Sequence, residues 1–240
     1  MIDLIKKMLK SNSVGKVIYP YLNKVYRIYS VRARQKRLKN YGIEVLAELV
    51  EINNKYDMGI VPIWGTLLGF VREGGFMKYD DDIDVAVLPG LNVKEVLDIF
   101  VEKYGYKFRH GLAYHGQCTE FTLEHKSGLT VDFFMMVDSG ENLLASVYFW
   151  KNGVNYADVR QNNLKWVKHP YVIGLKIFNF SGIEVKIPEN SEDWLYYEFG
   201  SDWRTPIPNH TDAMQPGKLP VEDYGYTATY EEIMNNSIPQ

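Results

Sequence analysis

The 240 residues predict an α/β (α+β) domain in which helices flank a mixed sheet. Short apolar runs bounded by glycine, proline or aspartate indicate buried strands. Segments with apolar residues at every third or fourth position indicate helices between them. The composition is that of a globular protein, with 46% hydrophobic and 24% charged residues. Length and composition therefore suit a chain that buries a full core.

The first 40 residues form a basic segment. They carry eleven Lys or Arg residues and one acid, Asp3, which gives +10, whereas residues 41–240 carry 16 bases and 29 acids, which gives −13. Apolar residues at helical spacing near the N-terminus and a basic-aromatic run over 19–39 are typical of a helix that lies on an anionic membrane. We therefore expect residues 1–40 to be a basic amphipathic segment in peripheral contact with such a membrane. A solvated helix that caps the folded domain (41–240) is an equal alternative, and nucleic acid is not an expected partner.

Several features bear on the compartment. No run of 18 apolar residues is present, and the first nine residues lack the apolar stretch and cleavage site of a secretory signal. Cys118 stands alone, so no internal disulfide can form. A reducing, cytoplasmic location is the expectation, with the chain peripheral at the inner face of the membrane.

The first half of residues 41–240 gives the clearest elements. Apolar residues from Ile43 to Ile52 predict a helix over 42–56, and Ile60–Trp64 reads as a short buried strand. The run Ile83–Leu88 predicts a second strand, stopped by Pro89 and Gly90. A helix is expected over 93–104.

The second half gives weaker patterns. Strands are expected over 118–123, 129–137, 171–180 and 183–187, and a helix over 192–199. Proline and polar residues are frequent after Asp202. We therefore expect an irregular tail with one short helix over 230–234.

The sharpest chemical feature is the run Asp80-Asp81-Asp82-Ile83-Asp84. Side chains alternate along a strand, so Asp80, Asp82 and Asp84 would share one face, with Asp81 pointing the other way. Crowded carboxylates repel one another unless a cation neutralises them, and all-oxygen ligands favour Mg²⁺ or Mn²⁺. The alternative is a solvated acidic turn, which the directly following apolar strand makes less favoured.

Two further elements add to this cluster. Gly65 and Thr66 would open a turn whose backbone N–H groups and hydroxyl can approach phosphate oxygens, although Gly followed by Leu-Leu also marks ordinary close packing. Asp132 lies between apolar strand residues, where a lone carboxylate is costly unless it meets a metal or a cation. It is either an edge-strand residue facing solvent or, beside Asp82 and Asp84, the third carboxylate of a metal centre.

Basic residues near these motifs are candidates for contact with substrate phosphate. Arg72 could bind phosphate bidentately or pair with a crowded aspartate. Arg204 could bind phosphate or fix the C-terminal segment through an Asp–Arg pair, and Lys78 could contact phosphate. His110 and His115 are candidate general bases, although a lone histidine near a strand is more often a surface or packed residue.

Two motifs together resemble the LicD family, which includes bacterial phosphocholine transferases and is related to fukutin and the fukutin-related protein. The first motif runs Gly65-Thr66-Leu67-Leu68-Gly69, Val71-Arg72, Gly74-Gly75-Phe76 and Asp80-Asp81-Asp82-Ile83-Asp84. The second is Tyr197-Glu198-Phe199-Gly200-Ser201-Asp202-Trp203-Arg204-Thr205-Pro206. Lys78-Tyr79, Glu73 and the inserted Ser201 depart from the family's usual residues. The first two departures flank the metal strand and leave the donor's identity open.

The resemblance, over about residues 41–208, implies a nucleotidyltransferase fold of the polymerase-β type. It implies a metal-dependent phosphotransferase that moves phosphocholine or a polyol phosphate from a CDP-activated alcohol donor to a glycan or glycolipid acceptor, as in lipopolysaccharide or capsule biosynthesis. Asp82, Asp84 and Asp132 would be the metal carboxylates and the catalytic residues, with Asp80 as a further candidate ligand. Gly65, Thr66, Arg72, Lys78 and Arg204 would bind substrate.

Three alternatives remain open at the level of sequence. A nucleotidyltransferase would attach a nucleoside monophosphate to a small molecule or protein and release pyrophosphate. A metal-dependent glycosyltransferase would use an Asp-x-Asp motif and release UDP. A non-catalytic, membrane-associated assembly protein would not need the aspartates at all.

Overall fold

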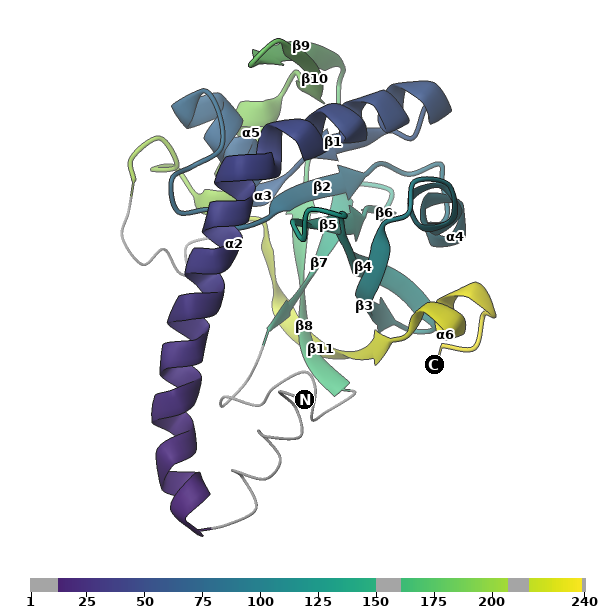
Figure 1. Cartoon of the computed structure of the whole chain (residues 1–240). Helices are drawn as coiled ribbons and strands as arrows, with labels where there is room; N and C mark the ends of the chain where they lie inside the picture. The colour runs from purple at the N-terminus through teal and green to yellow at the C-terminus, as the bar shows by residue number, and fades with distance from the viewer. Residues whose placement is uncertain (1–12, 150–160, 207–215, 239–240) are drawn as a thin grey trace.

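A computed structural model describes residues 13–149, 161–206 and 216–238. Within these ranges, nine strands form one mixed sheet in the order β1-β2-β5-β4-β3-β11-β8-β7-β6, and β9 and β10 form a separate two-stranded sheet. Figure 1 shows helices lying against this curled sheet. The predicted α/β fold with a mixed sheet flanked by helices is confirmed.

The elements of the first half are α2 (Ser13–Tyr56), β1 (Ile60–Pro62), α3 (Trp64–Leu68), the π-helical segment η1 (Gly69–Glu73), β2 (Ile83–Val87), α4 (Val93–Leu97), a second π-helical segment η2 (Asp98–Lys103), β3 (Lys107–Tyr114) and β4 (Gln117–Glu124). Those of the second half are β5 (Thr130–Met135), β6 (Val137–Asp138), β7 (Leu143–Phe149), β8 (Gln161–His169), β9 (Leu175–Phe180), β10 (Ile183–Pro188), α5 (Ser191–Phe199), β11 (Lys218–Ala228) and α6 (Tyr230–Met234).

The long helix α2 contains the predicted helix 42–56 and continues toward the N-terminus through residue 40 without a break. Its C-terminal half is buried against the sheet through Val45, Leu49 and Ile52. Its N-terminal half extends beyond the sheet (Figure 1). The membrane prediction for residues 1–12 falls outside the described residues, and the division at residue 40 stays a prediction.

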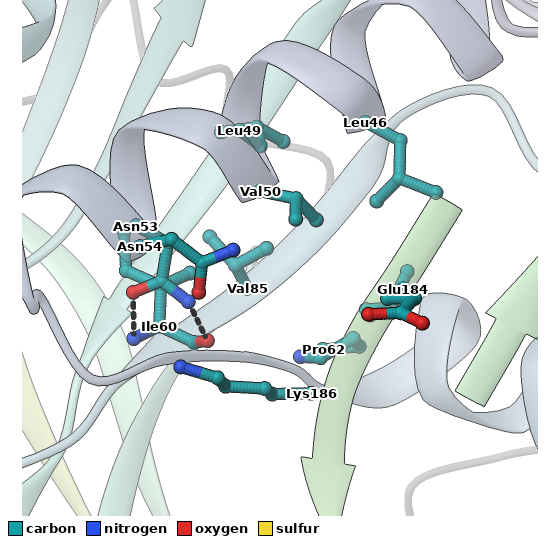
Figure 2. Close-up of a pocket in the computed structure, with 11 residues that line it drawn as sticks. Leu46, Leu49, Val50, Asn53, Asn54, Ile60, Pro62, Val85, Glu184 and Lys186 are labelled. Carbon is teal, nitrogen blue, oxygen red and sulfur yellow. Dashed lines mark hydrogen bonds between the residues drawn. The ribbon is translucent and has the colours of Figure 1, made fainter. Parts of the chain in front are cut away.

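Asn53 anchors the end of α2 to the first strand. Its side-chain amide donates to the carbonyl of Ile60 at 2.8 Å and accepts from the N–H of Ile60 at 3.0 Å. Figure 2 shows both bonds at one side of a pocket between α2 and β10, which Leu46, Leu49 and Val50 help to line. The two bonds therefore hold the C-terminal end of α2 against the edge strand β1.

Strand residues alternate between two hydrophobic layers. Val85 and Phe133 face the layer that contains Phe100 and the buried side of α2. Ala86 and Phe134 face the opposite layer, where Trp194 of α5 packs. Because the period of a strand is two, Asp84 and Asp132 belong to the second face. The carboxylates therefore lie on the face of β2 and β5 opposite to the hydrophobic layer of Val85 and Phe133.

The predicted elements of the first half are present, as are the strands β4, β5, β9 and β10, the helix α5 and the short helix α6. Two strands are shorter than predicted: β1 ends at Pro62, with Trp64 beginning α3, and β9 begins at Leu175. The expectation of an otherwise irregular tail is wrong, because residues 218–228 form β11 between β3 and β8. Its register shifts between Lys218 and Glu222, around Pro220, which has no N–H to donate. Pairing on both sides overrides a local sequence rich in turn-forming and charged residues.

Candidate metal centre

Four strands bring a row of polar side chains together on one face of the sheet. Asp84 of β2 lies opposite Asp132 of the parallel strand β5. Asp132 lies opposite Thr122 of β4, and Thr122 lies opposite His110 of β3. Register partners share a face, so these four side chains form one line across the sheet.

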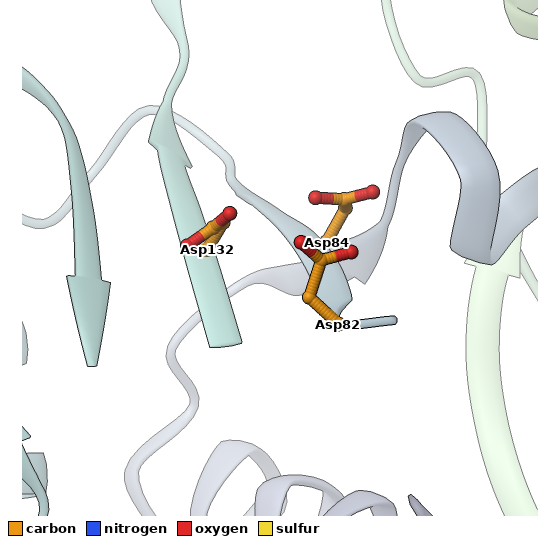
Figure 3. Close-up of side chains that lie close together, drawn as sticks. All are labelled: Asp82, Asp84 and Asp132. Atoms are coloured by element: carbon orange, nitrogen blue, oxygen red, sulfur yellow. The ribbon is translucent and has the colours of Figure 1, made fainter. Parts of the chain in front are cut away.

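Asp82 joins this row from the residue before β2 begins. One carboxylate oxygen each of Asp82, Asp84 and Asp132 lies within 4.8 Å of the others. Figure 3 shows the three carboxylates gathered in the same space, two from one end of β2 and one from β5. The structure thus brings together the three aspartates that the sequence predicts as metal ligands.

The backbone of Asp84 is held by the N-terminal end of α3 and the residue before it. The Thr66 hydroxyl accepts a hydrogen bond from the N–H of Asp84 at 2.9 Å, and the N–H of Ile63 donates to the carbonyl of Asp84 at 3.2 Å. Thr66 is buried. Thr66 therefore helps to hold β2 in place. Its contact with substrate phosphate stays a prediction.

Crowding and burial keep protons on these carboxylates when no cation is present. Burial, followed by the neighbouring carboxylates of Asp132, Asp81 and Asp80, raises the pKa of Asp82 to about 8. Burial also raises the pKa of Asp84 well above its usual range, with Asp82 as the next cause. A divalent cation would remove the free-energy cost of ionising Asp82 and Asp84, because it neutralises their negative charges.

Asp132 differs from its neighbours because it accepts a hydrogen bond. The Thr122 hydroxyl donates to Asp132 Oδ1 at 2.5 Å. Burial raises the pKa of Asp132 to about 6, while this hydrogen bond opposes the rise. Asp132 can therefore ionise at a lower pH than Asp82.

Glu120 is a fourth acidic group that the sequence reasoning missed. It lies on β4 two residues before Thr122, on the same face. Burial raises its pKa well above the usual range, and Asp132 is the next cause. The alternation of Glu120 and Thr122 with apolar residues in the predicted strand 118–123 is the signal that could have identified both.

Asp80 and Asp81 lie outside the group of three. Asp80 lies beside the glycine turn, where a Cβ on Gly65 would come within 3.2 Å of its Oδ1. Burial raises the pKa of Asp80 to about 6. Asp81 pairs with Arg34 of α2, whose Nε lies 2.8 Å from Asp81 Oδ2. A ligand role for Asp80 stays a prediction, whereas Asp81 ties α2 to the acidic segment.

Arg72 is engaged within the protein. Its Nε donates to Glu73 Oε1 at 2.9 Å, its Nη1 to the carbonyl of Trp203 at 3.1 Å, and its Nη2 to the sulfur of Met77 at 3.1 Å. It thereby links η1 to the second motif. Among the described residues, no aspartate forms an ion pair with the Arg72 guanidinium.

The other two basic candidates lie at the surface. Arg204 pairs with Glu192 of α5 and stacks on Trp203, with 4.1 Å from its guanidinium carbon to the ring centroid. The acidic partner is therefore Glu192, where the sequence suggested an aspartate. Lys78 lies 5.3 Å from the centroid of the Tyr79 ring. Whether Arg204 or Lys78 binds phosphate stays a prediction.

The two candidate histidines lie in different settings. His110 Nε2 is 3.3 Å from the Thr122 hydroxyl, and burial lowers its pKa. His115 lies at the turn between β3 and β4 with a positive φ and packs edge-on against Tyr114. The Thr122 hydroxyl thus contacts both His110 and Asp132, whereas His115 belongs to a turn.

The three carboxylates could together provide the oxygen ligands of a divalent cation. Oxygen ligands from two adjacent strands, partly open to solvent, suit Mg²⁺ or Mn²⁺, which also bind substrate phosphate. The pKa values of Asp82 and Asp84 are raised because burial and the neighbouring carboxylates disfavour their ionised forms, which a bound cation would stabilise. The residues present therefore fit a metal-assisted reaction at a phosphate.

Comparison with known proteins places this centre in a family. A family model described as LicD/FKTN/FKRP, nucleotidyltransferase domain, matches residues 62–190, more than half of the chain. The chain is 23% identical over 154 residues to the ribitol-5-phosphate transferase FKTN of Mus musculus, a match that covers 63% of this chain and 31% of the mouse protein. The chain thus spans about a third of that relative's length. Among solved structures, it is similar to the lincosamide antibiotic adenylyltransferase LnuA with lincomycin bound, with a TM-score of 0.38, 10% identity, and coverage of 63% of this chain and 83% of that one.

Proposed function

The chain belongs to the LicD/FKTN/FKRP nucleotidyltransferase-domain family, and on that premise we propose that it is a metal-dependent phosphotransferase. It moves a phospho-alcohol, such as phosphocholine or a polyol phosphate, from a CDP-activated donor to a hydroxyl of a cell-surface glycan. The observation that carries this proposal is the cluster of Asp82, Asp84 and Asp132 on two adjacent strands. The name of the mouse relative, a ribitol-5-phosphate transferase, supports a polyol phosphate as the transferred group.

The proposed reaction is a displacement at the phosphorus that carries the alcohol. The acceptor oxygen forms a bond to that phosphorus, the bond to the bridging oxygen of the diphosphate breaks, and CMP leaves. A divalent cation, when bound, neutralises the diphosphate and the charge that develops on the leaving oxygen. Asp82 and Asp84 would hold this cation.

Asp132 has the position and pKa for a second role. It would either complete the metal shell or accept the proton of the acceptor hydroxyl. Its pKa of about 6 leaves it ionised near neutral pH, and the hydrogen bond from Thr122 fixes the orientation of its carboxylate. Thr66 and Ile63 hold Asp84 in place from the opposite side.

A second candidate function follows from the family description itself, which is that of a nucleotidyltransferase domain. The same three carboxylates serve attack at the phosphorus next to the nucleoside, with release of pyrophosphate. The two functions differ in which phosphorus is attacked and therefore in the leaving group.

Product identity distinguishes these functions. The protein is incubated with Mg²⁺, a glycan acceptor and a panel of CDP-choline, CDP-ribitol, CDP-glycerol, nucleoside triphosphates and UDP-sugars. Release of CMP with a phosphodiester on the glycan supports the proposal. Pyrophosphate release supports the nucleotidyltransferase, and UDP release supports a glycosyltransferase. CMP release that is equal in the Asp84→Asn variant would contradict the proposed site.

We also propose that the projecting half of α2 lies on an anionic membrane that presents the acceptor. Its exposed side chains include Tyr21, Val25 and Tyr29, whose exposures are 73%, 65% and 75%. These residues lie at helical spacing and form one stripe. The sequence from 13 to 43 holds eight Lys or Arg residues and no acid, so repulsion disfavours self-association through this segment.

Binding of α2 to an anionic membrane is tested with vesicles of pure phosphatidylcholine and vesicles that contain phosphatidylserine. We expect co-sedimentation with the anionic vesicles, and a loss of most of it when Tyr21, Val25 and Tyr29 are all replaced by serine. Tyr224→Ser, at an exposed tyrosine of β11, is the matched control. Equal sedimentation of the triple variant and the wild type would overturn the membrane proposal, as would a concentration-dependent dimer that the triple variant abolishes. Among the described residues, no helix combines the length and apolar character that crossing a bilayer requires.

A further inference from the structure

A histidine and a glutamate form a completely buried pair next to Trp64. His169 at the end of β8 and Glu198 of α5 have no exposed side-chain surface, and His169 Nε2 lies 3.0 Å from Glu198 Oε1. Their remaining polar atoms, His169 Nδ1 and Glu198 Oε2, have no hydrogen-bond partner among the described residues. Burial of such groups costs free energy, which a well-packed apolar pair would avoid.

The pair contacts Trp64, the residue that begins α3. The indole of Trp64 packs edge-on against the His169 ring, with 5.4 Å between the ring centroids. Burial raises the pKa of Glu198, whereas the His169 ring and the backbone amide of Trp64 both lower it. The carboxylate is therefore next to the Trp64 backbone as well as to the histidine.

The backbone of Trp64 needs such support. Its φ is +50°, in the left-handed region that a bulky residue adopts at a cost. The amide beside Glu198 and the ring against His169 both belong to this residue. The buried pair thus contacts the strained residue through its backbone and through its side chain.

Trp64 lies between the two residues that hold Asp84. Ile63, one residue before it, donates to the Asp84 carbonyl, and Thr66, two residues after it, accepts from the Asp84 N–H. A change in the Trp64 backbone would shift both contacts. The position of Asp84 therefore depends on the conformation at residue 64.

A second contact joins the same segments. The carbonyl of Trp203 accepts a hydrogen bond from Arg72, which follows α3 in η1. Glu198 and Trp203 both belong to the second sequence motif, and Trp64 and Arg72 both flank the glycine turn. Residues of the second motif thus contact both ends of the continuous helical segment that α3 and η1 form.

We propose that the His169–Glu198 pair is a positioning device for the metal centre, which fixes the left-handed backbone at Trp64 and thereby the location of Asp84. His169 and Glu198 act through Trp64 and do not touch the reacting atoms. The inference rests on the proposed function for the role of Asp84, while the coupling between the pair and Asp84 can be measured in the protein without metal or substrate.

Amide hydrogen exchange in the metal-free protein tests this coupling. The variant Glu198→Leu removes the acceptor at similar volume, and Glu198→Gln keeps an acceptor oxygen. We expect exchange at the Asp84 amide to become about tenfold faster in the leucine variant relative to the amides of β4, with the glutamine variant close to wild type. Should the leucine variant not fold, His169→Phe keeps an aromatic ring against Trp64, removes the partner of Glu198, and should show the same relative acceleration.

A histidine on the other face of the sheet gives the matched control. His125 is also buried and packs against Tyr106, and its Nε2 lies 3.8 Å from Glu48 Oε2. His125→Gln should leave relative exchange at Asp84 unchanged. If Glu198→Leu lowers the midpoint of thermal unfolding and accelerates Asp84 and β4 equally, the pair is a stabilising contact alone and the inference is overturned.

Binding of Mn²⁺ gives a second measurement. Glu198→Leu should weaken Mn²⁺ binding by about tenfold, in the range seen when groups that orient metal ligands are removed, with recovery in Glu198→Gln. Equal Mn²⁺ affinity in the leucine variant and the wild type would overturn the inference. A wild-type protein that binds no Mn²⁺ would instead contradict the proposed metal site, while the exchange measurement would still decide whether the pair positions Asp84.

Discussion

Asp84 and Asp132 lie directly opposite each other on β2 and β5, which run parallel, although α4, η2 and two strands separate them in the chain. Because side chains alternate along a strand, a shift of one residue in either strand would send one of the two carboxylates to the apolar face. The metal centre therefore depends on the register of this strand pair. The apolar residues Val85 and Phe133, which follow the two aspartates and face the core, specify that register.

Replacement of Thr122 should change the pH dependence of transfer. The Thr122 hydroxyl lowers the pKa of Asp132, so Thr122→Val should raise that pKa. A hydrogen bond to a charged group contributes about 1.5–3 kcal/mol, equivalent to roughly one to two pKa units. Asp132 would then stay protonated to higher pH, and the acid limb of the pH–rate profile should move up by that amount. Thr122→Ser, which keeps the hydroxyl, is the control, and a wild-type profile in the valine variant would refute this role.

The metal-free protein should lose stability as the pH rises. The folded-state pKa of Asp82 is raised to about 8, so the folded protein binds more protons than the unfolded chain between pH ~4 and ~8. The contribution of Asp82 to the free energy of unfolding therefore falls across this window.

Removal of that charge should reverse the effect. Asp82→Asn should stabilise the metal-free protein at pH 8 by on the order of 1–2 kcal/mol, or roughly 3–6 °C in the midpoint of thermal unfolding. The measurement is thermal unfolding in EDTA at pH 5 and pH 8. Asp138→Asn is the control, because Asp138 is exposed and its hydrogen bond from Tyr171 lowers its pKa. A lower midpoint for Asp82→Asn at pH 8 in EDTA would contradict the account.

Cys118 should be unreactive in the folded protein. Burial raises the pKa of its thiol to about 12, and the side chain lies in the core between β4 and its neighbours. Since the thiolate is the reactive form, a thiol-specific reagent at pH 8 should label the native protein at least about a hundredfold more slowly than the chain in denaturant. Equal rates in the two conditions would show that the core around Cys118 is open.

Local patterns were sufficient to predict part of the fold. Ile83–Val87 and Thr130–Met135 are apolar runs interrupted by single aspartates, so both the strands and the aspartates stand out from the chain. The helices α5 and α6 were also predicted from the sequence. The residues alone left two readings of Asp132 open, an edge-strand residue that faces solvent and a third carboxylate beside Asp82 and Asp84. The family resemblance favoured the second, since spacing alone does not pair distant strands.

The remaining features depend on contacts between distant segments. Strand β11 contains Pro220 and Gly225 and acquires its conformation from pairing with β3 and β8. The row that joins Asp132 to Thr122 and His110 is set by register across three strands, which no local pattern specifies. The contact between His169 and Glu198, 29 residues apart, is of the same kind.

The central claim is that Asp82, Asp84 and Asp132 together hold a divalent cation. The most direct test is titration of Mn²⁺ followed by electron paramagnetic resonance, in the wild type and in Asp84→Asn, Asp132→Asn and Asp81→Asn. Asp81 is the control within the same acidic run, because its carboxylate pairs with Arg34. The account predicts binding by the wild type, a loss of at least about tenfold in affinity for Asp84→Asn and Asp132→Asn, and affinity within about twofold of wild type for Asp81→Asn. Wild-type affinity in Asp84→Asn would contradict it.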